Sequence, residues 1–205
     1  MDANAMSAKT EELIKVFEKN KGILRFSGIL NEGFHREQVK ALADSGRIRK
    51  IGHGLYQLAE APALSNPDLV SAILQSPKSV VCLISALFFH EATDEIPRRV
   101  DLAIPMGSRA NKIDYPPVKF FYFSKTSWKA GIETHKIDGY DVHVYDLAKT
   151  IADCFKFRNK IGFDVVQKAL KIAVTEKRIR PAKIMEYAKM CRVANVIRPY
   201  LEALV

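Results

Sequence analysis

Hydrophobic residues recur at helical spacing in the first fifty positions of the chain. In the last of these stretches Val39, Leu42 and Ala43 share one face, and the other face holds Glu37, Lys40, Ala41 and Asp44. Gly46 follows and is suited to end that helix as a C-terminal cap. The pattern predicts helices over residues 11–20, 23–31 and 34–45.

The pattern then changes from helical spacing to alternation. Residues 47–51 and 55–58 alternate apolar and polar side chains, and Gly52-His53-Gly54 lies between them. A glycine-containing turn between two alternating stretches is typical of a β-hairpin. Helices followed at once by a hairpin form the order of a winged helix-turn-helix, in which the last helix enters the DNA major groove and the hairpin, or wing, contacts the neighbouring backbone.

The remainder of the chain has the pattern of a mixed domain after a polar, proline-marked connection at 60–68. Strands are expected at 99–104 and 119–123, and a strand pair over 134–145 is expected to turn at Asp138-Gly139. Helices are expected at 68–75, at 80–91 and from 146 to the end. The predicted fold class is therefore α+β: a winged helix-turn-helix in residues 1–60 and an α+β domain with a small sheet and a helical end in residues 68–205.

The net charge of the chain is +9 at pH 7. Such a charge attracts a polyanion, whether nucleic acid, an acidic protein or an anionic membrane surface, and does not choose among them. Residues 21–58 hold seven lysines and arginines against three acidic residues. The excess of positive charge within the predicted winged helix-turn-helix favours duplex DNA as its partner.

Several features bear on compartment and cofactors. No stretch approaches eighteen consecutive apolar residues, and residues 1–5 lack the basic and apolar regions of a secretion signal. We therefore expect a cytoplasmic protein that does not span a membrane. Cys82, Cys154 and Cys191 are odd in number, far apart and inside apolar helical patterns. We expect buried thiols, no metal site and no cofactor.

The candidate DNA contacts come from the predicted third helix and the wing. Arg36, Gln38 and Lys40 are assigned to the major groove, because arginine and glutamine form paired hydrogen bonds with guanine and adenine edges. Wing residues are assigned to phosphates or the minor groove, and the alternative for each residue is a solvated helical surface. The full predicted DNA-binding set is Arg25, Ser27, Arg36, Gln38, Lys40, Arg47, Arg49, Lys50 and His53. Tyr56 is expected in the core rather than stacked on a base.

Several segments resemble a known family. The run from Phe34 to Ile48, closing on Gly52-His53-Gly54-Leu55-Tyr56, resembles the winged-helix segment of the AbiE-type antitoxins, the abortive-infection transcriptional regulators of type IV toxin–antitoxin systems. Residues 85–97, 100–105 and 144–154 resemble parts of that family's second domain. The wing here reads Gly52-His53-Gly54 where an arginine often stands in the family.

The resemblance implies a function and partners. The N-terminal domain is expected to repress its own promoter, with an operator of inverted repeats bound cooperatively by a chain that is monomeric in solution. The C-terminal domain is expected to counter a nucleotidyltransferase-like toxin, directly or indirectly.

Two alternatives remain open. One is a winged-helix transcription factor unrelated to a toxin. The other is a DNA-processing enzyme, in which Asp101, Asp114, Asp138 and Asp141 would hold a metal. No lysine or glutamate follows these aspartates at a diagnostic spacing, and His90 beside Glu91 is better explained as a helix-terminal histidine. We therefore expect the protein not to be an enzyme.

Overall fold

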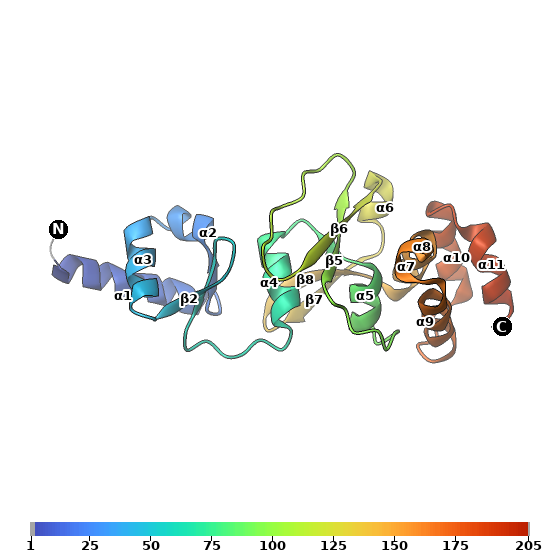
Figure 1. Cartoon of the computed structure of the whole chain (residues 1–205), viewed down its shortest axis with the longest axis horizontal. Helices are drawn as coiled ribbons and strands as arrows, with labels where there is room; N and C mark the ends of the chain where they lie inside the picture. Colours follow the sequence, from blue (N-terminus) through green and yellow to red (C-terminus); the bar gives the residue numbers. More distant parts are fainter. Residues whose placement is uncertain (1–2, 205) are drawn as a thin grey trace. The chain divides into compact units, whose positions relative to one another are not determined.

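The computed structural model describes residues 3–204 and has mixed helix and sheet, which confirms the predicted α+β class (Figure 1). Met1 and Asp2, part of the segment considered above for a secretion signal, lie outside the described residues. The chain forms two compact units. The first consists of Met1–Pro77, Asn111–Pro116 and Ile137–Tyr140, and the second of Lys78–Ala110, Pro117–Lys136 and Asp141–Val205. The proposed domain boundary between residues 60 and 68 stays a prediction.

The first unit begins with a winged helix-turn-helix. Its elements are α1 (Ala3–Lys19), β1 (Ile23–Arg25), α2 (Phe26–Asn31), α3 (Arg36–Asp44), β2 (Ile48–Gly52) and β3 (Leu55–Leu58). The strands form an antiparallel sheet in the order β1-β3-β2. The predicted first and third helices and the hairpin are confirmed.

The prediction of a single helix over residues 23–31 was wrong for the first three residues. Residues 23–25 form β1, whose Ile23 and Arg25 pair with Gln57 and Leu55 of the wing. The backbone N–H of Phe26 also donates to the carbonyl of Gly54 at 2.7 Å. These hydrogen bonds come from residues about thirty positions away, so local spacing could not reveal them. The helix α2 begins only after the chain leaves the sheet.

A small core fixes how α3 is presented. Side chains from α1, α2, α3 and β2 pack together, and burying each large one contributes about 1.5–3 kcal/mol. Because α3 gives Val39 and Leu42 to this core, its opposite face is left exposed. The buried members are Leu13, Ile14, Phe17, Ile29, Val39, Leu42 and Ile48.

The first unit also contains α4 (Pro67–Gln75), which corresponds to the helix expected at 68–75. Asn66 caps it, since its side-chain oxygen accepts a hydrogen bond from the Leu69 N–H at 3.2 Å. Pro67 occupies the first turn, where its missing N–H costs no helical hydrogen bond. The helix ends at Gln75, which contacts the wing as described below.

The second unit contains a mixed sheet with the strand order β6-β5-β4-β8-β7. The predicted strands at 99–104 and 119–123 are confirmed, and they lie side by side in parallel, with Val100 opposite Val118. The predicted strand pair around the turn at Asp138-Gly139 is also confirmed. The strands are β4 (Val80–Val81), β5 (Val100–Pro105), β6 (Val118–Phe123), β7 (Ile132–Ile137) and β8 (Tyr140–Tyr145).

Helices cover this sheet and form the helical end of the chain, as predicted. The segment 80–91 was expected to be wholly helical, but Val80 and Val81 pair with Ala103 and Leu102 before the helix begins. The short helix α6 was not predicted. The helices are α5 (Leu83–Phe89), α6 (Lys125–Lys129), α7 (Leu147–Lys156), α8 (Arg158–Ile161), α9 (Phe163–Thr175), α10 (Pro181–Met190) and α11 (Ala194–Glu202).

The helix α7 lies at the centre of the second unit's core and carries a buried ion pair. Lys149 and Asp153 are both fully buried and bonded to each other. The Cys191 thiol donates to Asp153 Oδ1 at 3.2 Å, and Lys149 Nζ lies 4.3 Å from the centroid of the Tyr145 ring. The three cysteines are free and buried, as predicted.

Candidate nucleic-acid interface

The exposed face of α3 follows directly from helical geometry. Successive residues are rotated by 100°, so Arg36, Lys40 and Ala43 lie close together around the helix. Lys40 is near the middle of the exposed arc, and Gln38 is on the far side. The acidic residues of α3, Glu37 and Asp44, lie at the edge of this arc away from Ala43. The face nearest the wing is therefore cationic and apolar.

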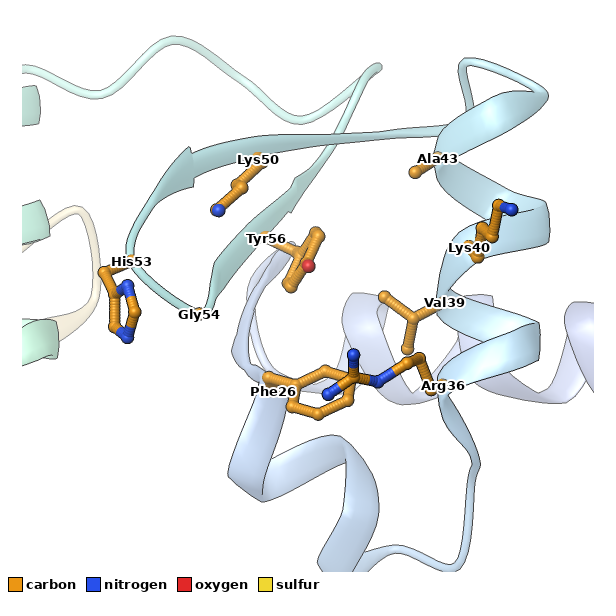
Figure 2. A pocket seen from close by; sticks show the side chains of 9 residues that line it. All are labelled: Phe26, Arg36, Val39, Lys40, Ala43, Lys50, His53, Gly54 and Tyr56. Carbon is orange, nitrogen blue, oxygen red and sulfur yellow. The ribbon is translucent and has the colours of Figure 1, made fainter.

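A cavity of about 540 Å³ separates α3 from the wing (Figure 2). Cationic side chains and a histidine stand around it, and apolar side chains form its floor. Among the residues that the structure describes, no acidic side chain lines it. We call it the α3–wing groove, lined by Phe26, Arg36, Val39, Lys40, Ala43, Lys50, His53, Gly54 and Tyr56.

Two ring contacts shape this groove. The guanidinium carbon of Arg36 lies 5.6 Å from the centroid of the Phe26 ring, a cation–π contact. The Phe26 and Tyr56 ring centroids are 6.4 Å apart. Figure 2 shows the Tyr56 ring and the Val39 side chain directed into the space between the wing and α3. Tyr56 packs against the core, and it also contributes to the groove.

The wing supplies Lys50 and His53 to the groove, while Arg49 makes a different contact. The Arg49 guanidinium donates to Gln57 Oε1 from Nε at 3.2 Å and from Nη2 at 2.9 Å. Gln57 is buried in β3, so this contact ties Arg49 to the wing's own sheet.

Arg47 differs from Arg49 and Lys50 because it is paired with a carboxylate. Its guanidinium is hydrogen-bonded to the Glu11 carboxylate, and that hydrogen bond raises the pKa of Arg47. A cation that already has a carboxylate partner gains less from a phosphate. Arg47 is exposed but does not line the groove.

Gln38 does not lie where a base-reading residue should. Its side chain is only 7 % exposed, and its Oε1 accepts a hydrogen bond from the His35 backbone N–H at 2.6 Å. This bond satisfies a backbone donor at the start of α3, which is how a glutamine at this position caps a helix. The assignment of Gln38 to the major groove is therefore withdrawn, because a buried capping side chain is not free to contact bases.

The remaining predicted contacts flank α2. Arg25 ends β1 and occupies the capping position of α2, and Ser27 lies in the first turn of that helix. Both are exposed, and neither lines the groove. The structure thus brings together Arg36, Lys40, Lys50 and His53 from the predicted set.

The sequence interpretation missed the apolar floor of the groove. It considered charged and hydrogen-bonding residues as DNA contacts and treated Val39, Ala43 and Tyr56 as core residues. For Ala43 this was wrong, because the residue is exposed and lines the groove. The signal was present for Ala43, because residues seven apart lie on nearly the same side of a helix. Arg36 and Ala43 are such a pair.

The tip of the wing is anchored within the first unit. The His53 backbone N–H donates to Gln75 Oε1 at 2.9 Å, and Gln75 is 3 % exposed. A side chain at position 52 would collide with this glutamine, because a Cβ there would lie 2.7 Å from Gln75 Nε2. Glycine at position 52 therefore allows α4 to approach the wing.

The four acidic residues considered for a nuclease each lie against polar partners, Asp114 with its Oδ1 3.6 Å from Lys112 Nζ. Asp101 is buried and accepts from Arg99 Nε at 3.2 Å. Asp138 accepts from the Ser65 backbone N–H at 2.9 Å, and Asp141 pairs with Lys136 at 2.6 Å. Within residues 3–204, no group of three or more His, Cys, Asp or Glu residues is arranged to hold a metal ion. None of the helices described there has the length and apolar character to cross a membrane.

The elements α1 to β3, with a cationic groove between α3 and the wing, define a winged helix-turn-helix of the kind found in transcriptional regulators. Residues 11–59 match the family model described as "Transcriptional regulator, AbiEi antitoxin". The match confirms, over this segment, the resemblance inferred from the sequence. No curated protein matches the chain.

Proposed function

We propose that the protein is a transcriptional repressor that binds duplex DNA through the α3–wing groove and serves as the antitoxin of a toxin–antitoxin pair. The observation that carries the DNA-binding part is the composition of the groove. Arg36 and Lys40 from α3 line it together with Lys50 from the wing, and no described acidic side chain lines it.

The geometry supports a standard mode of docking. A helix of nine residues such as α3 is about 14 Å long and fits the major groove, which is about 12 Å wide. Arg36 begins α3, so it would enter the groove first and contact base edges. Lys50 and His53 on the wing would then lie along the phosphate backbone, where cations displace condensed counterions.

The antitoxin part of the proposal assigns separate roles to the two regions. Residues 1–60 would bind the promoter of the protein's own operon, and residues 68–205 would counter a nucleotidyltransferase-like toxin, directly or indirectly. The family match over residues 11–59 supports the first role. The resemblance of residues 85–97 and 144–154 to the family's second domain supports the other, and the second unit has a core of its own.

The test uses full-length variants. Replacing Arg36, Lys40 and Lys50 together with alanine should abolish binding to the promoter DNA, measured by gel shift. The same variant, expressed from an unrelated promoter, should still rescue cells from the toxin. The matched control replaces Lys9, Lys15 and Lys19, which are exposed on α1 away from the groove, and removes the same charge. Equal loss of binding in both variants would contradict the proposed interface.

A second candidate function is a winged-helix transcription factor that has no toxin partner. It is favoured by one observation: the family match ends at residue 59, so the second unit lies outside it. Co-expression separates the two candidates. Failure of the wild-type chain to protect cells from the product of the neighbouring gene, with promoter binding intact, would favour the second.

A further inference from the structure

The floor of the α3–wing groove is apolar, which phosphate binding alone does not require. Phe26, Val39, Ala43 and Tyr56 line it together with the cationic side chains, and we call these four residues its apolar floor. Figure 2 shows Val39 and Ala43 on the side of α3 that faces the wing. A groove of this composition complements a ligand that carries both anionic and apolar groups.

The apolar floor has a defined position relative to Arg36. With a rise of 1.5 Å per residue, Val39 lies about 4.5 Å and Ala43 about 10.5 Å further along α3. Neighbouring bases on one DNA strand are about 3.4 Å apart. If Arg36 contacts one base pair, the apolar side chains therefore face base pairs about one to three steps away.

Base pairs show a single kind of apolar group in the major groove. That group is the C5-methyl of thymine, and 5-methylcytosine places an identical methyl at the same position. Alanine is among the side chains that contact this methyl, and arginine prefers guanine, to which it donates two hydrogen bonds.

We propose that the apolar floor of the α3–wing groove recognises the C5-methyl group of a pyrimidine, thymine or 5-methylcytosine, one to three base pairs from a guanine contacted by Arg36. The proposal rests on the proposed function, since it requires duplex DNA in this groove. It adds the chemical group that this floor selects.

The experiment starts from a duplex selected from random DNA by the full-length protein. Each thymine in the selected site is then replaced with deoxyuracil, which removes only the methyl group. Burying one methyl is worth about 0.8 kcal/mol, so one position should show about fourfold weaker binding. Replacing that thymine–adenine pair with cytosine–guanine, and then with 5-methylcytosine–guanine, distinguishes the two methyl sources, and the methylated form should bind about fourfold more tightly.

Two matched variants test whether the C5-methyl group contacts the apolar floor of the groove. Ala43→Ser replaces an apolar hydrogen with a hydroxyl in the groove, and should reduce the uracil effect to less than about twofold. Ala41→Ser makes the same change on another side of α3, outside the groove, and should leave the effect as in the wild type. Both variants keep the charge of the helix.

The outcomes separate this inference from the proposed function. If DNA binds sequence-specifically and every uracil substitution changes the affinity by less than twofold, the floor contacts only deoxyribose and the inference is wrong, while the proposed function stands. An uracil effect that Ala43→Ser leaves intact also overturns the inference. If the chain enriches no duplex and binds none, the proposed function itself fails.

Discussion

The guanidinium carbon of Arg36 lies 5.6 Å from the centroid of the Phe26 ring, so the first residue of α3 is held against the first residue of α2. Phe26 itself packs against the small core of the winged helix. The ring restricts the motion of the guanidinium without neutralising its charge. Arg36 is thereby held in position with its charge kept, as the proposed contact with a guanine requires.

Replacing Phe26 with leucine tests this role. Leucine keeps an apolar side chain but removes the ring face, a contact worth about 0.5–1 kcal/mol at an exposed site. We expect about two- to fivefold weaker binding to the selected operator, measured by fluorescence anisotropy, with an unchanged dependence on salt. Urea unfolding of the variant serves as the control for stability. A lower salt dependence would mean that Phe26 supports a phosphate contact instead.

Gln38→Ala should affect stability rather than base preference. The variant loses the acceptor that satisfies the His35 N–H, and losing such a cap costs about 1 kcal/mol of unfolding free energy. Chemical denaturation measures this, and repeating the operator selection measures preference. A change of preference at one base pair, with stability unaltered, would restore Gln38 as a base-reading residue.

Periodicity predicted much of the first unit because it reports which face of an element is buried. Val39 and Leu42 were expected in the core, and both are there, whereas Ala43, expected on the same face, is exposed. The same geometry could have corrected the assignment of Gln38 to the major groove. Gln38 lies 160° from Lys40 around α3, so the two cannot share a face. The residue type suggested adenine recognition, and that suggestion outweighed the position.

Other features depend on contacts between distant residues, which periodicity does not report. The strands β1 and β4 are too short to show alternation, and hydrogen bonds to β3 and β5 determine them. Lys149 and Asp153 are four residues apart on α7, a spacing that is also common for an exposed ion pair. Their complete burial follows only from the packing of the core around them. The groove likewise exists only where α3 and the wing come together.

The wing cations differ in their expected effect on salt dependence. Lys50 lines the groove, and Lys50→Ala should reduce the slope of log affinity against log salt by about 0.9, equally for all DNA sequences. Arg49→Ala tests whether the Arg49 guanidinium, which contacts Gln57, also binds a phosphate. If it does, the slope falls by about 0.9 in this variant as well.

Arg47→Ala provides the matched control, because Arg47 immediately precedes β2, the strand that holds Lys50. Its guanidinium is paired with Glu11, so its removal should leave the slope unchanged. The slopes are measured by titrating salt at fixed protein concentration. A reduction for Arg47→Ala as large as that for Lys50→Ala would show that the ion pair opens on DNA, contrary to this assignment.

The buried ion pair of α7 predicts strongly non-additive effects. Lys149→Met alone leaves the Asp153 carboxylate buried without its cation, which should cost about 3–5 kcal/mol of unfolding free energy. Adding Asp153→Leu removes the unpaired buried carboxylate and should recover most of the lost unfolding free energy. The control is Lys177→Met, whose partner Glu91 is exposed, and it should have little effect. Additive losses in the double variant would contradict the prediction.

The pH dependence of the unfolding free energy should reveal the raised pKa of Asp101. This carboxyl is 3 % exposed on β5, and burial raises its pKa, against the opposing effects of Arg99 and Lys119. At a pH between the unfolded pKa of about 3.9 and the higher folded pKa, the folded state therefore holds a proton that the unfolded chain has released. The stability due to this group is fully present below the unfolded pKa and is lost as the pH rises through the folded pKa.

The difference between wild type and Asp101→Asn isolates this contribution. Asparagine keeps an acceptor for Arg99 but does not titrate, so the variant's unfolding free energy should lack the fall that the wild type shows as the pH rises above about 4. Asp153, whose pKa burial also raises, is present in both proteins and cancels in the difference. Urea unfolding across the acidic range measures both curves, and Asp94→Asn, at an exposed position, should follow the wild type. A constant offset between wild type and Asp101→Asn would mean that Asp101 ionises alike in the folded and unfolded chain.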